Sequence, residues 1–160
     1  MSLRPFACAA AVLLGAGAAD AAPKAAVFDF QFADLAAQPP TQADMARLPR
    51  VSAELRKLLG ESGLYEIVPI EPVAAEVEAS APLRACGGCA ATFAQKLGAD
   101  VAITGEIQKV SNLILNLNVY ILDVDGKTPE RAYSVDMRGD TDESFDRAVR
   151  YIVRHNILKQ

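Results

Sequence analysis

The sequence contains no tryptophan, a single histidine and only 6% aromatic residues in its 160 positions. A surface that stacks nucleic-acid bases or sugar rings needs aromatic side chains, so that class of binding site is disfavoured. Basic residues are also in deficit, because 16 lysines and arginines face 20 aspartates and glutamates and give a net charge of −4. A nucleic-acid binder normally shows a basic face, and we therefore expect no nucleic-acid partner.

The chain also lacks an apolar run long enough to span a bilayer permanently, and the short one near its start resembles a cleavable leader. Arg4 supplies a positive charge, residues 6–17 form the apolar stretch, and Ala19-Asp20-Ala21 offers the small residues that signal peptidase requires. We predict a signal peptide over residues 1–21, cleaved after Ala21 or Ala22, and one domain over residues 22–160. The predicted location is the periplasm, with no integral membrane segment after cleavage.

Cysteine is scarce. Cys8 precedes most of the apolar run, where a lipid-attachment cysteine should follow it, so it is expected to leave with the leader. The remaining pair, Cys86 and Cys89, forms a C-x-x-C motif, and an even pair in an exported protein predicts a disulfide. A redox-active dithiol stays open, because the pair precedes a predicted helix whose N-terminus would stabilise a thiolate. Ala90 stands where haem attachment requires histidine and a zinc site lacks further ligands, so no cofactor is expected.

Hydrophobic periodicity predicts an alternation of strands and helices along the mature chain. The predicted strands cover residues 24–34, 64–70, 100–110, 113–123 and 131–138, and the predicted helices cover residues 42–59, 72–80, about 90–97 and about 142–157. This order predicts an α/β (α+β) sandwich: a mixed sheet of about five strands, ending in an antiparallel three-stranded meander, with about four helices packed mainly on one face.

Prolines, glycines and capping residues give local expectations within these elements. Pro49 cannot donate a helical hydrogen bond, so it must either kink its helix or mark the start of the main part. Gly105 is interpreted as a strand bulge, and Gly139 as a strand end. Asp140 or Thr141 is expected to cap the last helix.

A resemblance adds to this interpretation. Residues 97–107 (LGADVAITGEI) are similar to the G-A-D-x-x-x-x-G strand of the TolB N-terminal-domain and CsgG-like group of envelope proteins. The run from Cys86 to Leu158 resembles a family of uncharacterised bacterial secreted proteins, through residues 109–115 and 136–144. The resemblance implies the same fold and no assigned reaction. Curli-secretion members of the group form pores with long transmembrane hairpins and a lipid anchor, which this sequence does not show, so pore formation is not implied.

The C-terminal meander alternates apolar and polar residues, which predicts one buried face and one polar face. Carboxylate, amide, phenol and guanidinium groups side by side on three strands form a candidate surface for a partner or small polar ligand. An uncovered antiparallel sheet is polar on its outer side in any case, so the pattern alone does not establish binding. The candidate residues are Glu106, Gln108, Asn116, Asn118, Tyr120, Ser134, Asp136 and Arg138.

The acidic residues around the last helix give a weaker hypothesis. Asp136, Asp140 and Asp142 could contribute oxygens to a hard cation. The alternative is that Asp142 favours the helix start and that Asp136 lies on the polar side of its strand. We therefore predict no metal site as the first interpretation.

These patterns favour a non-enzymatic periplasmic accessory or binding protein that engages an envelope protein through its polar sheet face or its loops. Two alternatives stay open. One is a thiol–disulfide redox accessory that uses Cys86 and Cys89, and the other is a cation-binding periplasmic protein.

Overall fold

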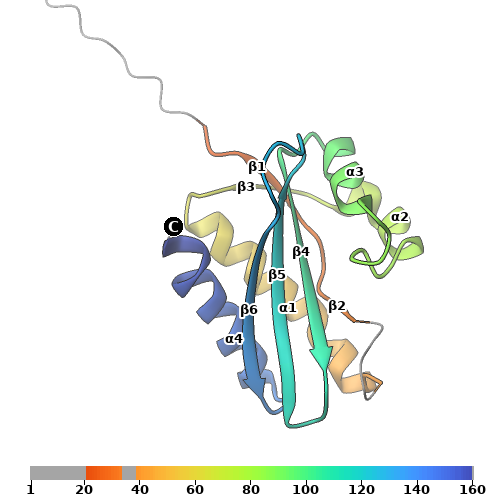
Figure 1. The fold of residues 1–160 in the computed structure, drawn as a ribbon, viewed down its shortest axis with the longest axis vertical. Coiled ribbons are helices and arrows are strands. Elements are labelled where there is room, and N and C mark those ends of the chain that lie inside the picture. The colour runs from red at the N-terminus through yellow and green to blue at the C-terminus, as the bar shows by residue number, and fades with distance from the viewer. Residues whose placement is uncertain (1–20, 34–38, 160) are drawn as a thin grey trace, which may run out of the picture.

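The computed structural model describes residues 21–33 and 39–159 (Figure 1). Cys8 and nearly all of the predicted signal peptide lie outside these residues, so the leader and its cleavage site stay predictions. Among the described residues, no helix is both long and apolar enough to cross a membrane. The elements are β1 (Lys24–Val27), β2 (Gln31–Phe32), α1 (Gln42–Glu61), β3 (Glu66–Val68), the 3₁₀ turn η1 (Glu71–Val73), α2 (Ala74–Ala79), α3 (Cys89–Lys96), β4 (Val101–Lys109), β5 (Ile114–Asp123), β6 (Arg131–Arg138), α4 (Asp142–His155) and the 3₁₀ turn η2 (Ile157–Lys159).

The strands form one mixed sheet in the order β3-β1-β4-β5-β6, with β2 beside β4 where β1 has ended. β1 pairs in parallel with β3 and β4, and β2 pairs in parallel with β4, whereas β4, β5 and β6 form the predicted antiparallel meander. The predicted fold class is therefore confirmed. The sheet has six strands rather than about five because the predicted strand 24–34 is interrupted between Val27 and Gln31.

The two faces of the sheet are covered unequally. Ala25 and Val27 join the main core, which α1 and α4 complete, while Ala26 and Phe28 point the other way into a smaller core. Phe93 of α3 packs edge-on against Phe28 there. The two long helices thus share one face, and α2 and α3 cover only one end of the other, at the upper right in Figure 1. No other helix of the described residues covers the rest of that face.

Helix α1 begins at a capping box in which Thr41 and Asp44 bond each other's backbone N–H groups. Pro49 lies inside the continuous helix, so the expectation that it marks the helix start is wrong. Thr141 caps α4 by accepting a hydrogen bond from the Ser144 N–H, which confirms one of the two predicted caps.

Gly105 is not a strand bulge, because β4 and β5 pair without a register shift from Val101 to Lys109. A Cβ atom at this position would lie 2.2 Å from the ring of Phe30. The glycine is therefore required by the close approach of an aromatic ring to the β4 backbone. Gly139 follows β6 with φ +90°, as expected for a residue that ends a strand.

Candidate functional site

All eight sequence-predicted surface residues lie on one face of β4, β5 and β6, the face opposite α1 and α4. Cross-strand register builds this face in rows, since side chains of opposed residues stand on the same side of a sheet. We call these eight residues the polar sheet face. One row is Gln108, Asn116 and Asp136, the next is Glu106, Asn118 and Ser134, Tyr120 follows on β5, and Arg138 stands opposite Ile114 at the other end.

Hydrogen bonds between β5 and β6 fix the first part of this face. Asn116 Nδ2 donates to Asp136 Oδ1 at 2.9 Å, and Ser134 Oγ donates to Asn116 Oδ1 at 3.0 Å. The amide of Asn116 is thereby held at both of its polar atoms. Asp136 and Ser134 remain exposed, so they present a positioned carboxylate and hydroxyl to solvent.

On the β4 side, Glu106 is the shared acceptor. Gln108 Nε2 donates to Glu106 Oε2 at 3.3 Å, and the Tyr120 hydroxyl donates to the same oxygen at 3.4 Å. Burial, and then the negative charge of Glu106, raise the pKa of Tyr120 above its ordinary value. Asn118, in the middle of the face, is only 7% exposed. Six of the eight side chains are therefore joined by hydrogen bonds, whereas the buried Asn118 Nδ2 has no hydrogen-bond partner among the described residues.

Arg84 closes one end of the polar sheet face. Its guanidinium lies 3.6 Å from the centre of the Tyr120 ring and pairs with both oxygens of Glu130, at 2.5 and 3.0 Å. This is a cation–π contact combined with a bidentate ion pair. Sequence reasoning missed Arg84 because it lies in the irregular segment before Cys86, where no periodicity places a side chain over the sheet.

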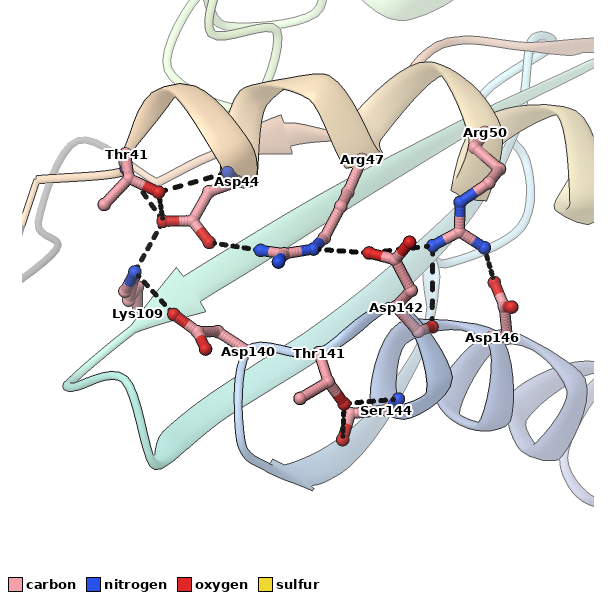
Figure 2. Close-up of polar contacts among 10 residues, drawn as sticks. All are labelled: Thr41, Asp44, Arg47, Arg50, Lys109, Asp140, Thr141, Asp142, Ser144 and Asp146. Atoms are coloured by element: carbon pink, nitrogen blue, oxygen red, sulfur yellow. Dashed lines mark hydrogen bonds and ion pairs between the residues drawn. The ribbon is translucent and has the colours of Figure 1, made fainter.

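The three carboxylates proposed as weak metal ligands have separate partners. Asp136 belongs to the polar sheet face, Asp140 lies 3.4 Å from Lys109 Nζ, and Asp142 pairs with Arg47 at 2.7 Å (Figure 2). The hydrogen bond from Arg47 lowers the pKa of Asp142. Across residues 21–33 and 39–159, no group of three or more His, Cys, Asp or Glu side chains is arranged to hold a metal ion.

A buried ion pair lies behind these surface contacts. Lys109 Nζ is 2.5 Å from Asp44 Oδ2, and both side chains are 0% exposed. Burial would raise the pKa of Asp44, but hydrogen bonds from Lys109 and Thr41 outweigh it and lower the pKa. Arg47 also contacts Asp44. The Lys109–Asp44 pair joins the start of α1 to the end of β4 (Figure 2). A sequence signal existed, because residue 109 falls on the helix-facing side of β4, where the alternation otherwise places apolar side chains.

The predicted disulfide partners are adjacent. The sulfur atoms of Cys86 and Cys89 lie at disulfide distance, 1.94 Å, and Cys89 is the first residue of α3. A redox or metal-binding role for this pair stays a prediction.

An apolar groove of about 640 Å³ lies between β2, the first half of α1 and α2. Sequence patterns could not find it, because its lining comes from four separate segments. Among the described residues that line it, Asp29 and Glu78 are ionisable, and Asp29 is paired with Arg56. The described lining therefore offers no acid–base pair for catalysis.

Comparison with known proteins identifies a family and a shared fold. The sequence model of the family described as "Protein of unknown function (DUF2380)" matches residues 23–157. No curated protein matches the chain in sequence. This agrees with the predicted resemblance to a family without an assigned reaction.

Solved structures similar to this chain include three from different bacteria. The LpoB C-terminal domain from Salmonella enterica has 16% identity and a TM-score of 0.50, covering 72% of this chain and 83% of its own. A PelC dodecamer from Paraburkholderia phytofirmans has 13% identity and a TM-score of 0.51, covering 83% and 86%. The lipoprotein GNA1162 from Neisseria meningitidis has 12% identity and a TM-score of 0.51, covering 84% and 99%. At these identities the similarity establishes the fold alone.

Proposed function

We propose that this chain, which belongs to the DUF2380 family of proteins of unknown function, is a non-enzymatic accessory protein of the bacterial envelope that binds a partner protein through its polar sheet face. One observation carries the proposal. Within the described residues no helix covers most of the outer face of β4–β6, and six of the eight polar side chains there are already joined by hydrogen bonds.

Preorganisation is what makes such a face suitable for recognition. Side chains that are fixed before binding lose little conformational entropy when a partner arrives. Asp136, Ser134 and Gln108 are exposed, yet the first two are tied to Asn116 and the third to Glu106. The surface can therefore present carboxylate, hydroxyl and amide groups in a constant arrangement to a polar protein surface.

The envelope location is supported by two independent features. The first is the predicted leader with the paired cysteines, which suits an oxidising compartment. The second is the fold, which the chain shares with a protein titled a lipoprotein. The proposal places the mature domain in the periplasm, where an envelope protein would meet the polar sheet face.

Site-specific photo-crosslinking in living cells tests the proposal. A photoreactive amino acid at Ser134 or Gln108 should give a discrete crosslinked species, because both positions are exposed on the face. The same amino acid at Glu143, an exposed position on α4, is the matched control and should give none. Asp136→Arg should reduce the yield at Ser134 at least about tenfold, whereas Glu143→Arg, with the same change in charge, should not. Crosslinks confined to Glu143, or none from the face, would contradict the proposal.

A further inference from the structure

We infer that the tip of the β4–β5 hairpin is a membrane-contacting element that places Val110, Leu113 and Ile114 in the interface of a lipid bilayer. The inference goes beyond the proposed function, because none of the three apolar residues belongs to the polar sheet face, which the tip adjoins only at Arg138. It concerns which surface the domain rests on while the rest of that face remains free.

The three side chains form a concentrated apolar patch. Val110 is 55% exposed, Leu113 is 64% exposed and Ile114 is 51% exposed. Seven large hydrophobic residues of the described chain are exposed in all, and these three fall within five consecutive positions. In Figure 1 the β4–β5 hairpin is the lowest point of the ribbon, so its tip projects beyond the helices and the other strands. A clustered, exposed apolar patch on a soluble domain marks an interaction site.

Seven backbone groups of the tip are already hydrogen-bonded within the protein, which lowers the cost of placing them in an apolar environment. The N–H groups of Val110 and Ser111 both donate to the Ile114 carbonyl, and the Ser111 hydroxyl accepts from the N–H groups of Leu113 and Ile114. The carbonyls of Asn112 and Leu113 accept from the residues that follow β6. The tip can therefore enter a lipid interface without leaving these groups unpaired.

The base of the hairpin is rigidly supported. Lys109 directly precedes Val110, and its ammonium is held by Asp44 and Asp140 from two other segments (Figure 2). The apolar side chains are thus presented in one arrangement, which lowers the entropy lost on binding.

Shape and charge favour a bilayer over a protein pocket. Residues 110–114 carry no charge, and Arg138, an exposed cation, stands opposite Ile114 in the register. A guanidinium beside an apolar tip suits the phosphate level of a lipid surface. Three apolar side chains at a projecting hairpin tip suit shallow, reversible insertion and are too few for a stable interface between two copies of the chain.

The absence of tryptophan makes the inference directly measurable. Leu113→Trp introduces a single reporter at the tip, and Leu64→Trp introduces one at an exposed apolar position elsewhere. The full chain is expressed with its leader, purified from the envelope fraction and checked for its N-terminus by mass spectrometry. Vesicles of phosphatidylethanolamine and phosphatidylglycerol should shift the Leu113→Trp emission to shorter wavelength, and brominated lipids should quench it. Leu64→Trp should show neither effect, and an equal response from both reporters, or none from Leu113→Trp, would overturn the inference.

A second measurement keeps the test independent of the reporter. Leu113→Asp combined with Ile114→Asp should lower the fraction that floats with vesicles at least about tenfold, while Leu64→Asp should leave it unchanged. Circular dichroism checks that each variant is folded. Flotation that survives the double substitution, or a dimer in sedimentation that the same substitution abolishes, would overturn a lipid target. Crosslinking from Ser134 is read separately, so failure here is distinguishable from failure of the proposed partner-binding face.

Discussion

At the scale of single residues, the most unusual feature is Lys109. A lysine ammonium with no exposure is rarely tolerated in a protein unless it is paired and hydrogen-bonded. Here the partner carboxylate also belongs to a helix capping box, so one ion pair stabilises a helix start and neutralises a buried strand residue. The pair therefore links two elements whose contact no local pattern requires.

We expect Lys109→Met to lower the free energy of unfolding by about 3 kcal/mol. The substitution keeps the apolar stem but leaves Asp44 buried with Arg47 as its main cationic partner, which places the effect at the lower end for broken buried pairs. Urea denaturation monitored by circular dichroism measures it.

The control is the double variant Asp44→Asn with Lys109→Met. Asparagine keeps an oxygen for the Thr41 N–H but carries no charge, so the double variant should be more stable than Lys109→Met alone. Asp44→Asn alone completes the comparison. If the losses of unfolding free energy of the two single variants add up to that of the double variant, Lys109 and Asp44 are not energetically coupled.

The residue scale also separates what sequence reasoning could and could not find. The rows of the polar sheet face were predictable, because strict alternation in β5 and β6 assigns each side chain to a face. Arg84 and Asp44 were not, because their contacts depend on segments distant in sequence. Lys109 was visible as an exception to the alternation, although the exception does not reveal its partner.

At the scale of elements, side chains of α1 form hydrogen bonds with the backbone of residues 27–30, where β1 ends. After β1 ends, the Val27 carbonyl accepts from Arg56 Nε at 2.9 Å, and the Phe30 N–H donates to Ser52 Oγ at 2.9 Å. These contacts satisfy backbone groups that would otherwise need another strand. The apolar pattern of residues 24–34 predicted one continuous strand because periodicity does not show where a helix side chain replaces a ladder bond.

Phe30 lies in the break between β1 and β2, and its ring lies against Gly105 of β4. We expect Gly105→Ala to lower the free energy of unfolding by about 1–3 kcal/mol, because the added methyl group would overlap the buried ring. Gly60→Ala in α1 is the matched control and should be neutral or slightly stabilising, since its Cβ would meet Ile67 only at 3.4 Å. Thermal unfolding compares the two. Adding Phe30→Leu should recover part of the loss, and no recovery would argue against the overlap.

At the scale of the whole molecule, the fold class followed from periodicity, whereas the strand order did not. The meander was predictable because its strands are consecutive and joined by short connections. The parallel order β3-β1-β4 joins segments that are separated by helices, and hydrophobic pattern alone does not choose between such pairings. The same reason explains why the second, smaller core under α3 had no sequence signal.

The ionisable groups of the fold predict that the free energy of unfolding is highest over a middle range of pH and falls at an acid edge and an alkaline edge. The folded-state pKa of Asp44 lies below its ordinary 3.8, so its contribution is present above that value and is lost as the pH falls through the lowered pKa. Burial raises the pKa values of Tyr120 and Tyr133 above 10.0, so stability is complete below that value and is lost as the pH rises through the raised pKa values. Denaturation across the pH range should show both edges. Asp44→Asn should flatten the acid edge and leave the alkaline edge unchanged, and an unaltered acid edge would show that another group controls it.

The position of β4 has a consequence for how the chain matures. It is the only strand that borders both the parallel and the antiparallel halves of the sheet, and it comes after more than half of the sequence. A polypeptide that emerges with its amino end first has β1, α1 and β3 in place before their central neighbour exists. The apolar surfaces of those early segments stay exposed until residues 101–109 are available. During that time they are suitable binding sites for a chaperone that prevents aggregation.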